Sequence, residues 1–365
     1  MTELTKEEKI KIVEDNIKAL KNKECNIFFF ILDTKGNPSG SLEYIYETAY
    51  TLREKGYNAC MLHQEKEEFI GVSDWMGERY SDIPHFNVET DKVDLRPCDF
   101  LIIPDIFASI MAQVKTAPCK KVLLVQNYNH LSEFMPFGVT PDMLNVTDII
   151  TTTNTQATIL KKWFPRMNIH IVSPHIKNVF RDNKKLKNLK VNIIGKNPSD
   201  VTRIVKTFHW EYPIFKWVSF CDLRGMSQEA LSEALQDGVC TVWVDEDTNF
   251  GYSALQALKC GSMVVAKLPK TFPDWVMEDK EGGKELTKSC VWFDHLDEVP
   301  KLIASIVNFW INDEVPEVLT KNIHGLDDLY TKEKHSNEVE NVYVEKFINN
   351  KLSEFEKTLD FVKNN

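Results

Sequence analysis

The sequence predicts an α/β protein with two domains and a helical C-terminal tail. Short apolar runs alternate with helix-forming segments and polar loops as far as residue 293, a pattern typical of mostly parallel sheets. The 365 residues are more than one hydrophobic core usually holds. Residues 296–365 contain a single glycine, Gly325, and carry apolar residues at helical spacing, which predicts the tail.

The first domain is expected to span residues 1–180 and to open with an amphipathic helix within residues 1–24. The apolar run 27–32 predicts a strand that is buried on both faces. A loop rich in turn formers, residues 33–41, then leads into a helix that ends near Gly56. Further strands of this domain are expected at residues 58–62, 99–103, 121–125, 148–152 and 169–172.

Two polar loops follow strands of the first domain, so they are expected at the carboxyl edge of its sheet, where open α/β sheets bind ligands. Their candidate site residues are Gly40, Ser41, Gln126, Asn127, Tyr128 and His130. The second loop combines hydrogen-bond donors, acceptors and an aromatic ring, a set that suits sugar hydroxyls. Each loop also has a plainer interpretation. A glycine-bearing loop is often only a tight turn, and a lone histidine is more often a surface or capping residue.

The second domain is expected to span residues 181–330, with the helical tail at residues 331–365. Ser227 has the character of an N-cap and predicts a helix over residues 228–236. The strands of this domain are expected at residues 191–194, 215–220, 240–244, 262–266 and 290–293.

The centre of the second domain is a strand–loop–helix–strand segment. An acidic loop, residues 245–249, follows the strand 240–244, and a helix then runs from Gly251 to a stop at Gly261. In such a βαβ unit the ligand lies beyond the carboxyl ends of the strands. Gly251 allows the backbone to approach a ligand, and the exposed N–H groups of the helix favour a phosphate. We therefore expect a diphosphate at this helix.

The same segment resembles a known family. Phe250-Gly251, four residues, and then QALKCG and MVVA are similar to the signature of GT-B glycosyltransferases, most of all the large retaining family that uses nucleotide-sugar donors. Two glutamates of that signature fall at Thr248 and Gln256, so this sequence departs from the family at both. The segment 125–128 resembles rhamnosyltransferase-like members. The resemblance implies two Rossmann-like domains that face each other across a cleft.

The resemblance also assigns roles to residues. It places the donor diphosphate at Lys196, Arg203 and Gly251, the ribose at Gln256, and the donor sugar along the acidic loop. Two cations would neutralise the departing diphosphate. The donor-side residues are Lys196, Arg203, Arg224, Asp245, Glu246, Thr248, Asn249, Phe250, Gly251 and Gln256, and the acceptor would lie against the two polar loops of the first domain. Arg203 is alternatively an exposed helix residue, Arg224 alternatively pairs with the acidic loop, and no catalytic residue is assigned.

The amino-acid composition limits the classes of molecule that this protein is expected to bind. The formal charge of −10 argues against broad binding to nucleic acid or acidic membranes, although a local basic groove stays open. The eight cysteines show no C-x-x-C spacing and are interpreted as reduced thiols. No stretch approaches the ~20 apolar residues of a membrane span. We expect a cytoplasmic protein with a nucleotide-diphosphate sugar as its substrate and with no cofactor or metal, and the sequence leaves the oligomeric state open.

Three other interpretations remain. With both family glutamates replaced, the protein is alternatively a non-catalytic nucleotide-sugar-binding or scaffold protein on the same fold. A glycosyltransferase that acts on modified DNA bases is a second alternative, and the acidic charge counts against it. A nucleotide-dependent epimerase on the same architecture is the third.

Overall fold

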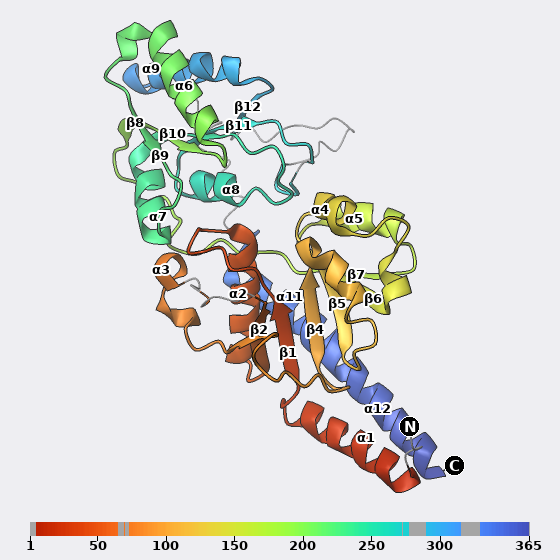
Figure 1. The fold of residues 1–365 in the computed structure, drawn as a ribbon. Coiled ribbons are helices and arrows are strands. Elements are labelled where there is room, and N and C mark those ends of the chain that lie inside the picture. The colour runs from red at the N-terminus through yellow and green to blue at the C-terminus, as the bar shows by residue number, and fades with distance from the viewer. Residues whose placement is uncertain are drawn as a thin grey trace. The chain divides into compact units, whose positions relative to one another are not determined.

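The computed structural model describes residues 5–64, 69, 73–271, 273–276, 290–314 and 329–364. The chain forms two compact units, each built on its own sheet (Figure 1). Unit 1 comprises Met1–Pro174 together with His335–Asn365, and unit 2 comprises His175–Lys334. The expected α/β class with two sheet domains and a helical tail is thus confirmed. Among the residues described, no helix is long and apolar enough to cross a membrane.

Unit 1 contains a seven-stranded parallel sheet in the order β3-β2-β1-β4-β5-β6-β7. Its strands are β1 (Asn26–Phe30), β2 (Asn58–His63), β3 (His85–Asn87), β4 (Phe100–Pro104), β5 (Lys120–Val125), β6 (Val146–Thr151) and β7 (Asn168–Ile171). Side chains of β1 alternate between two apolar cores, since Ile27 and Phe29 enter one and Phe28 and Phe30 enter the other. The strand order reverses between β1 and β4, which makes this the point where a ligand is expected.

Side chains cap the first helices of unit 1. Thr5 and Glu8 form a capping box at the start of α1, and the Ser39 side chain accepts the N–H of Leu42 at the start of α2. The α-helices are α1 (Lys6–Lys21), α2 (Gly40–Glu54), α3 (Ser73–Met76), α4 (Tyr128–Phe134), α5 (Asn154–Trp163) and α12 (Asn350–Asn364), joined by α11 (Lys332–Val339), which spans the boundary between the units. The other helices are the 3₁₀ helices η1 (Glu78–Tyr80), η2 (Asp105–Ala112) and η3 (Pro141–Leu144) and the π-helix η7 (Glu340–Asn349).

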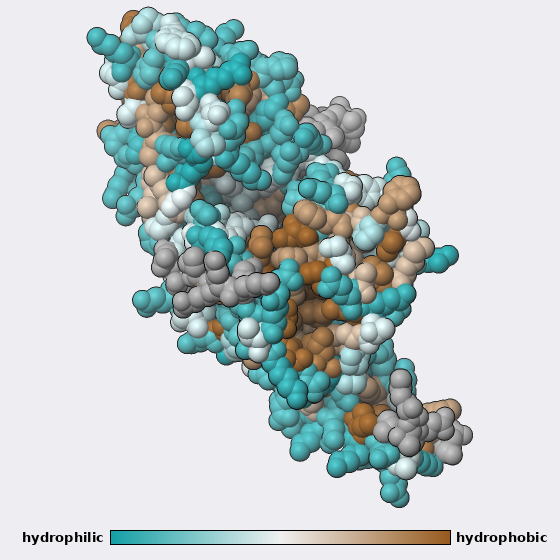
Figure 2. All heavy atoms as spheres, viewed as in Figure 1, coloured by the Kyte–Doolittle hydropathy of each residue, from teal (hydrophilic) through white to brown (hydrophobic). Residues whose placement is uncertain are grey.

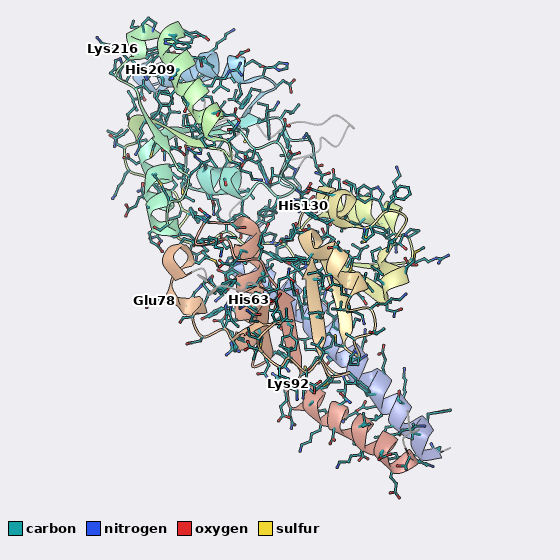
Figure 3. All side chains as sticks on the ribbon, in the orientation of Figure 1. His63, Glu78, Lys92, His130, His209 and Lys216 are labelled. Carbon is teal, nitrogen blue, oxygen red and sulfur yellow. The ribbon has the colours of Figure 1, made fainter. Side chains whose placement is uncertain are left out.

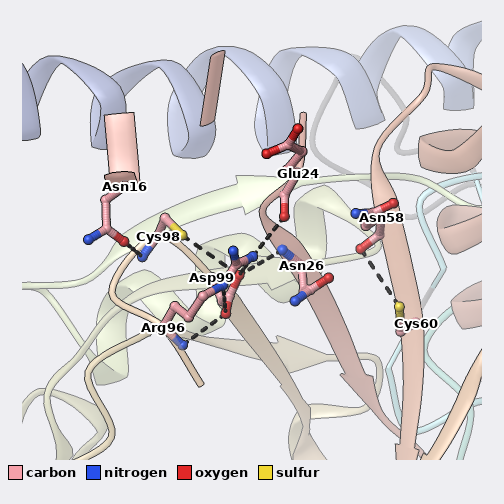
Figure 4. A network of polar contacts seen from close by, with 8 residues as sticks. All are labelled: Asn16, Glu24, Asn26, Asn58, Cys60, Arg96, Cys98 and Asp99. Carbon is pink, nitrogen blue, oxygen red and sulfur yellow. Dashed lines mark hydrogen bonds and ion pairs between the residues drawn. The ribbon is translucent and has the colours of Figure 1, made fainter. Parts of the chain in front are cut away.

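A buried carboxylate fastens the amino-terminal side of this sheet (Figure 4). Asp99 accepts the N–H of Asn26 at 2.8 Å and a guanidinium N–H of Arg96 at 2.9 Å. Arg96 also donates to the carbonyl of Glu24 at 2.7 Å, and Asn16 of α1 accepts the N–H of Cys98 at 3.0 Å. Asp99 has no exposed surface, so these bonds supply the partners that a buried charge requires. They join α1, β1 and the chain that enters β4.

The C-terminal helices belong to unit 1. Val339, Tyr343 and Phe347 are buried in the same core as Phe29. The Nδ1–H of His335 donates to the carbonyl of Ser173 at 2.7 Å, so the tail is also bonded to the end of the first segment of unit 1.

Unit 2 contains a five-stranded parallel sheet in the order β12-β11-β10-β8-β9, and its strand order reverses between β8 and β10. The strands are β8 (Asn188–Ile194), β9 (Ser219–Asp222), β10 (Gly238–Trp243), β11 (Met263–Lys267) and β12 (Cys290–Phe293). The helices are α6 (Pro198–Glu211), η4 (Pro213–Phe215), α7 (Gln228–Asp237), α8 (Tyr252–Lys259), η5 (Leu296–Glu298) and α9 (Val299–Ile311). Ser227 accepts the N–H of Ala230, so the predicted cap of α7 is confirmed.

Several local predictions were wrong. Gly40 and Ser41 open helix α2, and Tyr128 to His130 open helix α4, because Ser39 and Asn127 act as side-chain caps one residue before each helix. The predicted strand 215–220 begins only at Ser219, since Pro213 starts a 3₁₀ turn. The sequence prediction also missed β3, which has three residues and carries His85 and Asn87.

Candidate functional site

The loops after β8 and β10 meet at the strand-order reversal of unit 2. Gly195 and Lys196 follow β8, and Val244 and Asp245 follow β10. The N–H of Lys196 donates to the Asp245 carboxylate over 3.2 Å. A Cβ at Gly195 would collide with the Val244 side chain, so only glycine allows the two loops to lie this close. Lys196 is exposed, and its ammonium forms no ion pair with any residue that the structure describes.

Asp245 occupies an unusual electrostatic position. Burial raises the pKa of its carboxyl group above the ordinary value, and the nearby Lys196 cation opposes that rise. A carboxyl group with a raised pKa takes up a proton more readily than a solvated one. An anion bound beside it would raise that pKa further and favour the uncharged form.

The rest of the acidic loop is neutralised by lysines. Lys270 pairs with Asp247 at 2.8 Å and with Glu246 at 3.2 Å, and Lys267 lies 3.6 Å from Glu246. The N–H of Lys270 also donates to the carbonyl of Glu246 at 3.1 Å. These contacts hold the loop against the chain that follows β11, so its charge is partly balanced within unit 2.

Gly251 is the left-handed residue that begins α8, with φ at +75°. A Cβ there would come within 3.1 Å of Trp275 and 3.2 Å of Trp243, so a side chain at this position would be tightly packed against two tryptophans. The Trp275 indole N–H donates to the Phe250 carbonyl at 2.7 Å, and the Thr248 hydroxyl accepts the N–H of Gly251 at 3.1 Å. The N-cap residue Gly251 has no side chain with which to cap α8, and the N–H groups at the start of a helix suit an anion.

Three further donor-side candidates are buried near α8. Asn249 and Phe250 in the loop and Gln256 within the helix each expose less than a tenth of their surface. The hydroxyl of Tyr252 donates to the carbonyl of His175 at 2.8 Å, which fixes the start of α8 to the first residue of unit 2.

The two arginine candidates have local carboxylate partners. Arg203 of α6 pairs with Asp297, and both side chains are more than half exposed. The Nε of Arg224 lies 3.0 Å from both carboxylate oxygens of Asp222, rather than beside the acidic loop. Lys196 and Asp245 therefore lie together at the strand-order reversal, whereas each arginine is paired with a carboxylate of its own.

In unit 1 a carboxylate that the sequence analysis missed organises the candidate residues. Asp105 is the first residue after β4 and is almost fully buried. It accepts the N–H groups of Gln126 at 2.8 Å and Asn127 at 2.6 Å, and its other oxygen lies 3.2 Å from His130 Nδ1. Figure 3 labels His130 on α4. Its signal in the sequence is an acid directly after the apolar strand, at the edge where ligands bind.

The first polar segment joins this group through the backbone. The Gln126 side-chain amide donates to the carbonyl of Ser41 at 2.9 Å, so the start of α2, next to Gly40, lies beside the start of α4. Tyr128 instead packs edge-on against Trp163, with 5.3 Å between the ring centres. The arrangement can offer hydrogen bonds to hydroxyl groups, with Asp105 holding His130. Within the described ranges no three His, Cys, Asp or Glu side chains gather as a metal site.

Comparisons with known proteins bear on the fold. No protein-family model and no curated protein sequence matches the chain. Among solved structures it is similar to sucrose-phosphate synthase from Thermosynechococcus elongatus, with 12% identity, a TM-score of 0.60, and coverage of 88% of this chain and 99% of that one. It is also similar to the pneumococcal O-GlcNAc transferase GtfA, solved with UDP and GlcNAc, with 9% identity, a TM-score of 0.58, and coverage of 93% and 99%.

A third similar structure is WaaG, a glycosyltransferase involved in lipopolysaccharide biosynthesis. It shows 11% identity and a TM-score of 0.53, with coverage of 86% of this chain and 99% of that one. At these identities the likeness establishes the fold alone. The chain has the GT-B fold of two Rossmann-like domains, as the sequence predicted. Its placement near the rhamnosyltransferase-like members stays a prediction.

Proposed function

We propose that the protein is a glycosyltransferase that moves a sugar, a hexose or deoxyhexose, from a nucleotide-diphosphate sugar to a saccharide or glycoconjugate. The observation that carries the proposal is the position of Lys196 at the strand-order reversal of unit 2, beside Asp245 and on a GT-B fold. Doubly wound sheets bind nucleotides at such a reversal. An exposed cation at this point suits a diphosphate.

The donor would lie in unit 2, residues 175–334. Its diphosphate would meet Lys196 and the first turn of α8, which together supply a positive charge and backbone N–H groups. Arg203 and Arg224 would have to break their ion pairs before they could bind the diphosphate. The nucleotide base is assigned to Arg224, the ribose to Gln256, and the donor sugar to Asp245, Glu246, Thr248, Asn249 and Phe250.

The acceptor would lie against unit 1, beside Gly40, Ser41, Gln126, Asn127, Tyr128 and His130. Asp105 engages the Nδ1 of His130 and so fixes the orientation of the ring at this edge of the sheet. In the reaction, the bond from the sugar carbon to the donor phosphate breaks and a bond to the acceptor oxygen forms. The hydroxyl proton passes to a base or to the departing diphosphate. Electrostatic stabilisation of that diphosphate would be the main catalytic effect.

We also propose that the reaction takes place in the cytoplasm without a cofactor. All eight cysteines are free thiols and seven of them are buried, which suits a reducing compartment.

A non-catalytic protein on the same fold is the second candidate. The hydroxyl of Thr248, at the position of one family glutamate, already accepts the N–H of Gly251, and Gln256, at the position of the other, is buried. This protein would bind a nucleotide sugar and release no nucleotide diphosphate.

A thermal-shift panel of nucleotide diphosphates and nucleotide sugars tests the donor site. A ligand that binds only the folded protein stabilises it by about 2.7 kcal/mol at a hundredfold excess over its dissociation constant. One nucleotide should raise the melting temperature of the wild type, and Lys196→Ala should lose most of that shift. Lys162→Ala, at an exposed lysine of α5, is the matched control and should keep it. If no nucleotide produces a shift, the proposed donor site is wrong.

A further inference from the structure

Large apolar side chains are exposed at one end of unit 2. Leu186, Trp210 and Ile214 expose 93%, 74% and 75% of their surface, and Trp217 exposes 51%. Of the large apolar side chains that the structure describes, four expose more than 70%, and three of those four belong to this group. Single exposed apolar residues are common on protein surfaces, whereas several at one place commonly mark a binding surface.

The fold brings these four side chains to the amino edge of the unit 2 sheet. Leu186 lies two residues before β8 and Trp217 two residues before β9, and β8 and β9 are parallel neighbours. Trp210 and Ile214 belong to the end of α6 and to η4, which return the chain to the start of β9. Figure 3 labels Lys216 at this end of unit 2. The proposed donor site lies at the carboxyl edge of the sheet, so this amino-edge surface is separate from it.

The amino-edge surface is basic, although the chain as a whole is acidic. Residues 181–190 and 206–217 contain seven lysines and arginines and two acids, within a chain of formal charge −10. Asp313 and Glu314 follow α9, which packs beside α6, and they reduce this positive charge without cancelling it. Four of the lysines are exposed and form no ion pair with any residue that the structure describes: Lys184, Lys185, Lys206 and Lys216.

This combination fits the surface of an anionic membrane better than it fits another protein. Figure 2 shows hydrophobic and pale side chains scattered among hydrophilic ones over the part of unit 2 where Figure 1 places α6 and α9. Tryptophan lies readily at the boundary between lipid headgroups and acyl chains, and lysine reaches the headgroup phosphates from the same depth. Interfaces between proteins are instead depleted of lysine.

We propose that the amino-edge surface binds the anionic lipids of a membrane as a peripheral contact. The four apolar side chains enter the headgroup region, and the four unpaired lysines lie against lipid phosphates. Because the rest of the chain is acidic, binding depends on this surface and weakens as salt is added. The inference goes beyond the proposed glycosyl transfer and does not rest on it. A second copy of the chain on the same surface is the competing occupant.

Sedimentation of the full chain with vesicles tests the role of the lysines. The vesicles are phosphatidylcholine alone or phosphatidylcholine mixed equally with phosphatidylglycerol, and the wild type should bind the anionic ones more tightly by about tenfold or more. Each lysine near an anionic surface contributes about fivefold, so the double variant Lys185→Glu, Lys216→Glu should lose at least roughly thirtyfold. The control Lys346→Glu, Lys357→Glu changes the net charge equally, at exposed lysines of the C-terminal helices, and should bind as the wild type does.

The same assay tests the apolar side chains. The double variant Leu186→Ser, Ile214→Ser should bind the anionic vesicles about tenfold more weakly, because two side chains that would enter the headgroup region become polar. Both residues are exposed, so the fold should be unaffected. Phe137→Ser with Met143→Ser removes two exposed apolar side chains of unit 1 and should leave binding unchanged.

Vesicles with brominated acyl chains locate the contact, because bromine quenches the fluorescence of tryptophans that enter the membrane. The double variant Trp210→Phe, Trp217→Phe keeps the surface apolar, so it should still bind but should lose most of the quenching. Trp163→Phe, at an exposed tryptophan of α5, should keep it.

Three results would overturn the inference: no preference for anionic vesicles, binding that both the glutamate and the serine variants retain, or quenching that does not depend on Trp210 and Trp217. A concentration-dependent dimer that Leu186→Ser with Ile214→Ser dissociates, with no binding to vesicles, would assign the surface to a second copy instead. Failure of the proposed function looks different, because then no nucleotide shifts the melting temperature while binding to anionic vesicles persists.

Discussion

The backbone N–H of Lys196 and the carboxylate of Asp245 are 3.2 Å apart, and this contact joins the loops after β8 and β10 where the strand order reverses. It puts a lysine and a partly buried carboxyl group side by side in the proposed donor site. The carboxyl group has a raised pKa, mainly because it is buried. A bound diphosphate would add negative charge nearby and raise that pKa further.

The charge of Asp245 should therefore weaken nucleotide binding. Asp245→Asn keeps an oxygen that can accept the Lys196 N–H and removes the charge, so it should tighten nucleotide-diphosphate binding about fivefold to tenfold, or ~1 kcal/mol, as expected for a solvated charge pair. Because a raised pKa favours proton uptake, wild-type affinity should increase as pH falls towards the pKa of Asp245. The variant should lack this dependence.

Isothermal titration with the nucleotide found in the panel, between pH 5 and pH 8, measures both effects. Asp247→Asn is the control, because that carboxylate is exposed and paired with Lys270. Weaker binding by Asp245→Asn would show that the carboxylate helps the donor to bind rather than opposing it.

Substitutions of Asp105 and of His130 should have different effects: the first should mainly lower stability, and the second should mainly lower activity. Asp105→Ala leaves the N–H groups of Gln126 and Asn127 without their acceptor, so it should destabilise the protein by about 2–4 kcal/mol. His130 is partly exposed, so His130→Ala should cost less than about 1 kcal/mol. It should nevertheless reduce turnover by roughly 10²-fold, if its ring bonds to a reacting hydroxyl.

Urea denaturation and steady-state kinetics test the two variants. Equal losses of stability would mean that His130 is mainly a packing residue, and unchanged turnover by His130→Ala would remove it from the site. Ser132→Ala, elsewhere on α4, is a suitable control for both measurements.

The cost of a side chain at Gly251 can be measured by comparison with Gly225, a glycine with a similar backbone conformation. Gly251→Ala would suffer both the cost of a left-handed alanine, about 1–2 kcal/mol, and a collision with Trp275 and Trp243. Gly225 has φ at +72° and no atom within 4 Å of the place where a Cβ would lie, so Gly225→Ala should show the backbone cost alone. The larger loss of thermal stability is expected for Gly251→Ala. Equal losses would mean that the tryptophans move away without cost.

The sequence predicted the elements that local pattern determines. Continuous apolar runs identified β1, β10 and β12, and Ser227 identified the start of α7. The GT-B fold was predicted from the short motif around Phe250-Gly251, and the structural comparisons confirm it. The roles given to individual site residues stay predictions.

Contacts between distant parts of the chain were beyond the sequence. Asp105 meets His130 because β4 and β5 are neighbours in the sheet, and no local pattern announces that pairing. The reason for glycine at position 251 lies partly in Trp275, which is far along the chain. Arg203 likewise pairs with Asp297 from another element. Such contacts depend on strand order and packing, which cannot be predicted from the local patterns of one sequence.

His335 predicts how stability depends on pH. Burial lowers the pKa of its imidazole to about 4, from 6.5 in a solvated histidine, so the folded protein keeps it neutral. Between these values the unfolded chain binds the proton and the folded chain does not. The stability that His335 contributes is therefore complete above pH 6.5 and is lost as the pH falls towards 4, by an amount of order 3 kcal/mol.

Urea denaturation at several pH values between 7.5 and 4 measures this loss. His335→Gln cannot titrate in this range, so its stability should fall less steeply with acid than that of the wild type. Parallel curves for the two proteins would show that other groups, such as His85, whose pKa burial also lowers to about 4, cause the whole acid dependence.

The most direct test of the central claim is release of nucleotide diphosphate from the nucleotide sugar that binds best, measured with and without a panel of saccharide acceptors. The account predicts slow release without acceptor, faster release when one of the saccharides is present, and loss of both in Lys196→Ala. Binding of the nucleotide sugar with no release under any condition would contradict it, and would identify the protein as a non-catalytic binder on a GT-B fold.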